Sequence, residues 1–108
     1  DLLYAGVQKK FSRWPNAVVI RGRVPESLEV LKEVEHIAYI SIDLNVTEAE
    51  MSAIEVLWSR MSRGGLVLLD DYGWAQHVNQ KLAWDDWALR NGVMILALPT
   101  GQGLLRKP

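Results

Sequence analysis

The stretch Leu66-Val67-Leu68-Leu69-Asp70-Asp71-Tyr72-Gly73 decides how this chain is expected to fold. Four consecutive apolar residues, preceded by the turn pair Gly64-Gly65, are typical of a short strand buried in a sheet. The acidic pair marks an abrupt end to that strand. Apolar runs of this kind are characteristic of parallel strands covered on both faces, so the stretch predicts an α/β protein with polar groups at a strand end.

The segment before this stretch predicts a strand followed by a helix. Residues 37–42 form a second near-continuous apolar run, and Asp43 ends it. Thr47 and Glu50 have the spacing of a capping box, which predicts a helix start. Gly64-Gly65 is expected to stop that helix. The helix is expected to turn one apolar stripe inward, made of Met51, Ile54, Leu57, Trp58 and Met61.

The remaining chain continues the alternation of helices and strands. A helix over residues 3–14 is followed by a short strand at 17–20 and a short helix beginning at Pro25. A last helix is expected over 75–90, with strands at 93–98 and 104–106 after it. Its apolar side is expected to comprise Val78, Leu82 and Leu89. We therefore predict a Rossmann-like sheet with parallel strands near 18–21, 37–42 and 66–70, the last two adjacent, and an antiparallel C-terminal strand.

Composition limits the classes of partner. The 108 residues are 49% apolar and include five Trp, which is enough for one core. Twelve Lys and Arg against 13 Asp and Glu leave a net charge of −1, which argues against nucleic acid or an anionic membrane and favours a small-molecule partner. No apolar run approaches the roughly 18 residues of a membrane span, so a cytoplasmic location is expected. The lack of Cys excludes disulfides and thiolate chemistry within these residues.

Three acidic residues follow the two central predicted strands. Asp43 ends one strand, and Asp70-Asp71 end the next. Because the carboxyl ends of parallel strands meet at one edge of a sheet, we expect the three carboxylates to converge there. Such a group suits Mg²⁺, which binds carboxylate oxygens and keeps several waters. The alternative left open by the spacing is that these acids only cap the helices that follow them.

Two further polar residues lie near the predicted acid cluster. Asn45 is a candidate for orienting a substrate hydroxyl, with a turn or cap role as the alternative. His77 is a candidate general base at the start of the last helix, with a solvated helix residue as the alternative.

Three segments carry a resemblance to a known family: residues 42–45, 64–73 and 98–103. From about Val18 onward, the chain resembles class I S-adenosylmethionine-dependent methyltransferases related to the macrocin O-methyltransferase family. The resemblance implies methyl transfer from S-adenosylmethionine to a sugar hydroxyl with Mg²⁺ assistance. It also implies that Asp43, Asp70 and Asp71 occupy the metal positions.

The chain departs from the family pattern in two respects. Asn45 stands where the family has the Asp that serves as general base, and Thr47 replaces a Tyr. In addition, no Gly-rich cofactor loop precedes Ala17. We therefore expect residues 1–108 to be the C-terminal part of a class I methyltransferase domain, with Gly22 and Arg23 supplying one side of the adenine pocket.

Two other readings compete with a methyl-transferring enzyme. A receiver-type phosphoryl-transfer domain also groups three Asp, but it places its Asp pair after the first strand and a Lys at a later strand end, unlike this chain. A catalytically inactive, truncated methyltransferase-like module remains open. Its open sheet edge is expected to favour a homodimer.

Overall fold

Two parallel strands form the centre of the protein. The computed structural model describes all residues 1–108, and in it β1 (Ile37–Ile42) pairs with β2 (Met61–Leu69). The register sets Tyr39 against Leu66 and Ile42 against Leu69. The prediction that these two apolar runs are neighbouring parallel strands is therefore confirmed.

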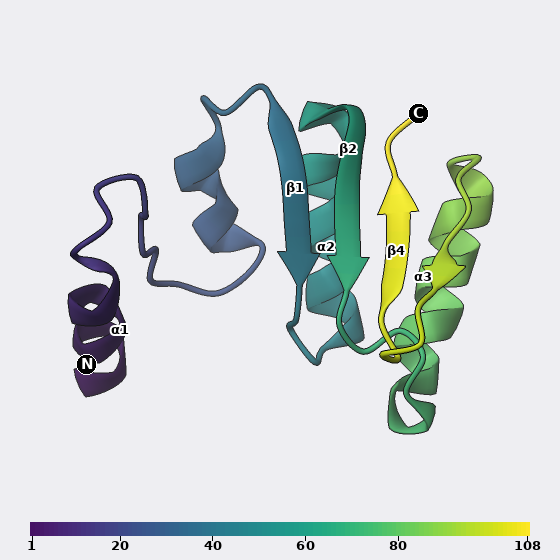
Figure 1. Ribbon diagram of the computed structural model, residues 1–108, viewed down its shortest axis with the longest axis horizontal. Coiled ribbons are helices and arrows are strands. Elements are labelled where there is room, and N and C mark those ends of the chain that lie inside the picture. Colours follow the sequence, from purple (N-terminus) through teal and green to yellow (C-terminus); the bar gives the residue numbers. More distant parts are fainter.

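The sheet has four strands in the order β1-β2-β4-β3 (Figure 1). The C-terminal strand β4 (Gly103–Arg106) lies antiparallel between β2 and the two-residue strand β3 (Leu96–Ala97). The expected α/β class and the antiparallel last strand are confirmed. The strand predicted over 93–98 is shorter than expected, because only two of its residues pair with β4.

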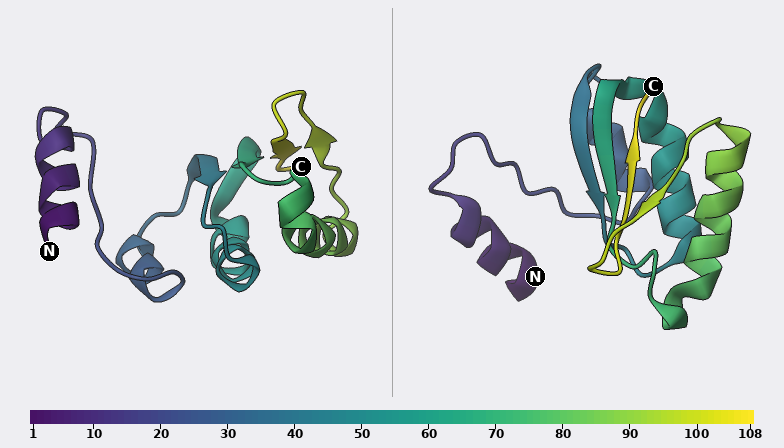
Figure 2. Two further views of the ribbon diagram at one scale, coloured as in Figure 1. Left: turned by 90° about the horizontal axis from the view of Figure 1, so that it is seen from below. Right: turned by 45° about the vertical axis from the view of Figure 1, so that its right-hand side comes forward.

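One face of the sheet carries the core. Helices α2 (Thr47–Leu57) and α3 (Val78–Arg90) lie on the same side of the strands (Figure 2). The largest fully buried side chains fill the space between them: Trp84, Trp87, Ile54, Leu69, Leu105 and Val67. The opposite face exposes Tyr39 and Leu66. The expectation of strands covered on both faces is therefore wrong for residues 1–108, because both long helices adjoining the sheet cover one side.

The N-terminal third contributes little to this core. None of residues 1–41 is buried, the first buried residue being Ile42. Helix α1 (Leu2–Phe11) is capped by Asp1, whose side chain accepts from the Leu3 amide at 3.0 Å, and Figure 1 shows it set apart from the sheet. Residues 17–20 form no strand, because β1 pairs only with β2 and no described strand lies beside them. The predicted parallel strand near 18–21 is therefore wrong.

The helix between the central strands ends earlier than predicted. α2 stops at Leu57, and a 3₁₀ turn, η2 (Trp58–Arg60), leads into β2. Met61 and Gly64-Gly65 thus belong to the strand. A Cβ on Gly65 would lie 3.1 Å from the carbonyl oxygen of Ile37, so the close approach of the two strands requires glycine there. The capping box is also wrong: Val46 is the N-cap residue and makes no side-chain cap.

The last helix turns a different side to the core from the one predicted. Val78, Leu82 and Leu89 are all exposed. The buried positions are Gln80, Trp84, Trp87 and Ala88. Two 3₁₀ turns complete the elements: η1 (Glu26–Leu31) before β1, and η3 (Ala75–His77) before α3. No helix has the length and apolar character needed to span a membrane.

Candidate functional site

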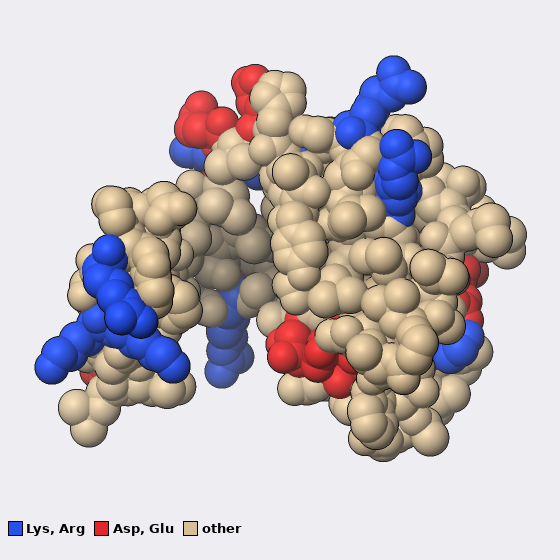
Figure 3. Space-filling view, viewed as in Figure 1, with Lys and Arg blue, Asp and Glu red and all other residues tan.

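The three predicted acidic residues meet where β1 and β2 end. Asp43 follows the last residue of β1, and Asp70 and Asp71 follow β2. One carboxylate oxygen from each lies within 4.8 Å of the others. Figure 3 shows acidic side chains gathered at this edge of the sheet, whereas Lys and Arg gather over α1. The parallel pairing thus produces the convergence expected from the sequence.

Mutual repulsion is visible in the electrostatics of the cluster. The negative charge of Asp70 is the largest cause of a raised pKa at Asp43, and desolvation and Asp71 add to it. A hydrogen bond with Asp70 acts in the same direction, while His77 partly opposes the shift. Like charges brought this close favour binding of a proton or a cation. The arrangement therefore suits a hard cation, which would relieve the repulsion.

Asp71 holds a carboxylate that is largely enclosed. Its side chain is 13% exposed, and its Oδ2 is buried without a hydrogen-bond partner. Its Oδ1 lies 3.8 Å from Nε2 of His77. A buried oxygen without a donor is costly, and a bound cation would satisfy it. This unpartnered oxygen is the strongest sign that the three acids fit a metal ion. The alternative role as a helix cap fails for Asp71, because α3 begins only at Val78.

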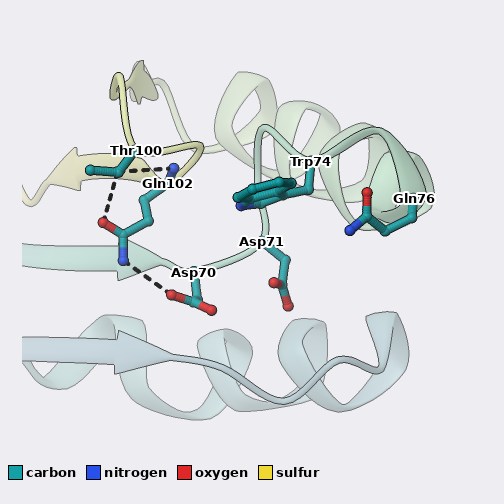
Figure 4. A pocket seen from close by; sticks show the side chains of 6 residues that line it. All are labelled: Asp70, Asp71, Trp74, Gln76, Thr100 and Gln102. Atoms are coloured by element: carbon teal, nitrogen blue, oxygen red, sulfur yellow. Dashed lines mark hydrogen bonds between the residues drawn. The ribbon is translucent and has the colours of Figure 1, made fainter.

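A pocket of about 510 Å³ opens beside the acids (Figure 4). It is lined by Asp70, Asp71, Trp74, Gln76, Thr100 and Gln102. Gln102 Nε2 donates to Asp70 Oδ1 at 3.0 Å, and Thr100 Oγ1 donates to Gln102 Oε1 at 2.9 Å. The loop before β4 therefore orients one of the acids. Amide, hydroxyl and indole groups around a pocket of this size suit a polar organic molecule.

The turn that carries the acids is held from behind. The ring of Tyr72 is buried against Gly103, where a Cβ would lie 2.7 Å from Tyr72 Cγ. The Tyr72 hydroxyl donates to Asp85, which Lys81 also contacts at 2.6 Å. Burial and this hydrogen bond raise the pKa of Tyr72. Desolvation opposes ionisation of Asp85, but the hydrogen bonds from Lys81 and Tyr72 outweigh it and lower its pKa. The network fixes the backbone that follows Asp71.

Of the other predicted site residues, only His77 lies next to the acid cluster. His77 lies beside Asp71, as described above. Asn45 is exposed, has a left-handed backbone (φ 58°), and lies outside the acid pocket. It therefore occupies a turn, which was the alternative reading of this residue. Gly22 and Arg23 are exposed in the loop before η1. The next residue, Val24, lines a mainly apolar pocket that also contacts Asp43 and Leu44.

Sequence reasoning missed two buried polar residues next to the site. Glu50 is 3% exposed and Gln80 is 4% exposed, and they are hydrogen-bonded to each other. Glu50 was assigned to a capping box, and Gln80 to no function. The available signal was the spacing from His77 to Gln80, three residues apart on one side of a helix. Gln102 and Thr100 were likewise missed, because the contact of Gln102 with Asp70, and of Thr100 with Gln102, depends on the antiparallel return of β4.

A protein-family model describes the chain well. The model of macrocin-O-methyltransferase (TylF) matches residues 7–95. The chain belongs to the macrocin O-methyltransferase family. The family relation predicted from the sequence is thereby confirmed, and the matched residues include two of the segments that suggested it, 42–45 and 64–73. None of the curated proteins matches the chain.

Among solved structures, the chain is similar to the O-methyltransferase NovP. The similarity has a TM-score of 0.77 at 16% sequence identity. It covers 95% of this chain but 44% of NovP, so the chain spans less than half the length of that relative. At this identity the likeness establishes the methyltransferase fold, and the family assignment rests on the match to the macrocin O-methyltransferase model.

Proposed function

We propose that this chain forms the metal and acceptor side of an S-adenosylmethionine-dependent O-methyltransferase, and that it is the C-terminal part of that domain. The family assignment supports methyl transfer. The observation that carries the site is the group of Asp43, Asp70 and Asp71 within 4.8 Å, with the buried Asp71 Oδ2 lacking a partner. Mg²⁺ is the cation that this oxygen donor set fits best.

The reaction is a direct displacement. An acceptor hydroxyl oxygen attacks the methyl carbon of the sulfonium, the carbon–sulfur bond breaks, and its electron pair stays on sulfur as a thioether. The hydroxyl proton leaves to a base. Mg²⁺ held by Asp43, Asp70 and Asp71 would supply charge stabilisation that makes the hydroxyl more acidic. No covalent bond to the protein is required.

The chain's own residues contribute binding and proton transfer. The pocket beside Asp70 offers Gln76, Thr100 and the indole of Trp74 to a polar acceptor such as a sugar. His77 is the proposed proton acceptor, since Nε2 lies 3.8 Å from Asp71 Oδ1 at the edge of the cluster. Asn45 is unsuited to this role, because an amide is not a useful base near neutral pH.

The cofactor is proposed to approach from the Asp43 side. Val24, Leu28 and Leu44 line an apolar pocket of about 320 Å³ that includes Asp43. Gly22 and Arg23 directly precede this pocket wall. An apolar slot next to the acid cluster suits the adenine ring of S-adenosylmethionine. The sulfonium of the bound cofactor would then point toward the acceptor pocket.

Magnesium calorimetry tests the proposed site. Mg²⁺ titrated into the purified protein should release or absorb heat with a single-site profile. Asp70→Asn should weaken binding at least about tenfold, since it removes one ligand charge. Asp86→Asn is the matched control, because Asp86 is exposed and pairs with Arg90 on the outer side of α3. Equal affinity in the wild type and Asp70→Asn would remove the metal site from the proposal.

A catalytically inactive module is the second candidate. It is favoured by Asn45, which stands at the place of the family's general base and lies outside the pocket. Under this reading the chain folds without turning over a substrate. Methyl transfer from labelled S-adenosylmethionine to sugar hydroxyls, measured with and without a chelator, separates the two. Chelator-sensitive transfer supports the enzyme, and its complete absence in the full-length protein supports the module.

A further inference from the structure

Two buried polar side chains lie directly behind the acid cluster. Gln80 Nε2 on α3 donates to Glu50 Oε1 on α2 at 3.0 Å. The amide oxygen of Gln80 contacts Nδ1 of His77, whose other ring nitrogen faces Asp71. Buried polar groups are costly unless their hydrogen bonds are satisfied. This chain of contacts connects the interior of the protein to the site.

The direction of the hydrogen bonds is fixed at Glu50. Trp84 Nε1 donates to Glu50 Oε2 at 2.9 Å, and an indole nitrogen can only donate. The amide of Leu44 donates to Glu50 Oε1 at 3.4 Å, and a backbone N–H can also only donate. Both oxygens of Glu50 are therefore acceptors. Gln80 must consequently turn its NH₂ group toward Glu50.

The orientation of Gln80 determines the state of His77. With its NH₂ group directed at Glu50, Gln80 presents its carbonyl oxygen to Nδ1 of His77. A carbonyl oxygen cannot donate, so Nδ1 must carry the hydrogen. In a neutral imidazole the other nitrogen, Nε2, is then the one with the free lone pair. That nitrogen is the one directed at Asp71 Oδ1.

We propose that Glu50 and Gln80 are positioning residues that hold His77 in its Nδ1–H form and direct its Nε2 toward the acid cluster. Hydrogen bonds from neighbouring groups commonly select the tautomer and ring orientation of functional histidines. The relevance of this arrangement to methyl transfer rests on the proposed function. The tautomer itself is a property of the folded chain that can be measured without substrate.

Long-range ¹H–¹⁵N correlation spectra of the protein provide the test. In spectra recorded at alkaline pH, the neutral imidazole of His77 should be predominantly in the Nδ1–H form. A preference of about tenfold is expected from one net hydrogen bond. A histidine in water prefers Nε2–H, so the result is opposite to the default. His36 is exposed and serves as the internal reference with the default pattern.

An isosteric substitution sharpens the test. In Glu50→Gln, the new amide should keep its oxygen toward Trp84 Nε1, because that bond of 2.9 Å is shorter than the 3.4 Å bond from the Leu44 amide, and this leaves its NH₂ group toward Gln80. Gln80 must then turn over and present its own NH₂ group to His77. Nδ1 becomes an acceptor, and the tautomer should invert to Nε2–H. Packing is almost unchanged, so a merely structural role for Glu50 predicts no inversion.

Two further variants complete the design. Gln80→Leu removes the acceptor for Nδ1–H and should return His77 to the pattern of His36. Asn79→Leu alters the neighbouring exposed position, which makes no side-chain hydrogen bond, and should leave the tautomer unchanged. Amide spectra check the fold of each variant. If a variant unfolds, the wild-type spectrum still decides.

Each outcome has a defined meaning. Nε2–H in the wild-type protein, or an unchanged tautomer in folded Glu50→Gln and Gln80→Leu, overturns the proposal. Inversion in Glu50→Gln together with an unaffected Asn79→Leu supports it. Magnesium titration of the same samples distinguishes failure of the proposed function from failure of the positioning role of Glu50 and Gln80. Absence of Mg²⁺ binding with an intact Nδ1–H form would count against the proposed function and leave the positioning role standing.

Discussion

The backbone amide of Asp70 donates a hydrogen bond of 3.1 Å to the carbonyl oxygen of Ile42. This bond continues the parallel pairing of β1 and β2 by one residue beyond β2. Asp43 follows Ile42, so the backbone ladder itself brings the first acid beside the second. Side-chain substitutions among the acids should therefore change charge while leaving the backbone of the cluster in place.

Asp43→Asn should stabilise the protein at neutral pH. The pKa of Asp43 is raised in the folded state, chiefly by Asp70, so the folded state binds its proton more tightly than the unfolded state does. Its contribution favours folding at low pH and is lost as pH rises above the unfolded value of 3.8 through the raised pKa. Because Asp43 is exposed, the effect should shrink in high salt.

Thermal unfolding from about pH 3 to pH 7 in low salt measures this effect. The midpoint of Asp43→Asn should exceed that of the wild type at the upper end of the range, and the difference should vanish at the lower end. Added Mg²⁺ should raise the wild-type midpoint more than that of the variant. A variant that is less stable than the wild type at pH 7 would contradict the repulsion inferred for this cluster.

Trp84→Phe should cost more stability than Trp87→Phe. Both indoles are almost fully buried, and both contact each other edge to face with centroids 5.5 Å apart. Only Trp84 donates to Glu50 Oε2. Removing that donor strands a buried carboxylate oxygen, which adds about 1–3 kcal/mol to the loss of packing. Urea unfolding of the two variants gives the difference. Equal free energies of unfolding would show that this hydrogen bond contributes nothing net.

The central part of the fold was predictable because its signals are local. The apolar runs at 37–42 and 66–69 each end at an acid, and a helix long enough to cross over lies between them. These features determine the parallel pairing, the strand-end positions of Asp43 and Asp70, and hence the candidate site.

The errors arose where distant contacts decide the outcome. Residues 17–20 have the composition of a strand, but a strand forms only where its backbone pairs with a neighbouring strand. No strand of the sheet lies beside these residues. Glu50 has the spacing of a capping residue, yet donors from Trp84 and Gln80, more than 25 residues later, draw its side chain into the core. In α3 the paired indoles of Trp84 and Trp87 take the buried side, which leaves Leu82 and Leu89 in solvent. The spacing of apolar residues along a helix does not by itself show which of two apolar sides packs against the core.

The isolated 108-residue chain should bind S-adenosylmethionine weakly. Seven of the nine residues that line the proposed adenine slot near Val24 and Asp43 are apolar, which leaves few groups to bind the ribose and methionine parts, and the chain spans 44% of NovP. Calorimetry with the cofactor and with S-adenosylhomocysteine should give dissociation constants well above the micromolar range. Binding in the low micromolar range, about −7 to −8 kcal/mol, would show that the described residues already form a complete cofactor site.

Hydrogen exchange should divide the chain into two parts. Residues 1–36 bury no side chain, so opening of α1 and the following loop breaks few apolar contacts and should need little free energy. Amides of Val67 and Leu69 lie in the centre of the sheet, with both side chains 2% exposed or less, and should exchange only on global unfolding. Mass spectrometry of peptides after brief labelling at neutral pH measures both. Peptides from α1 should be fully exchanged while those from β2 remain protected. Protection of α1 equal to that of α3 would mean that the N-terminal helix is held by interactions as strong as those of the core.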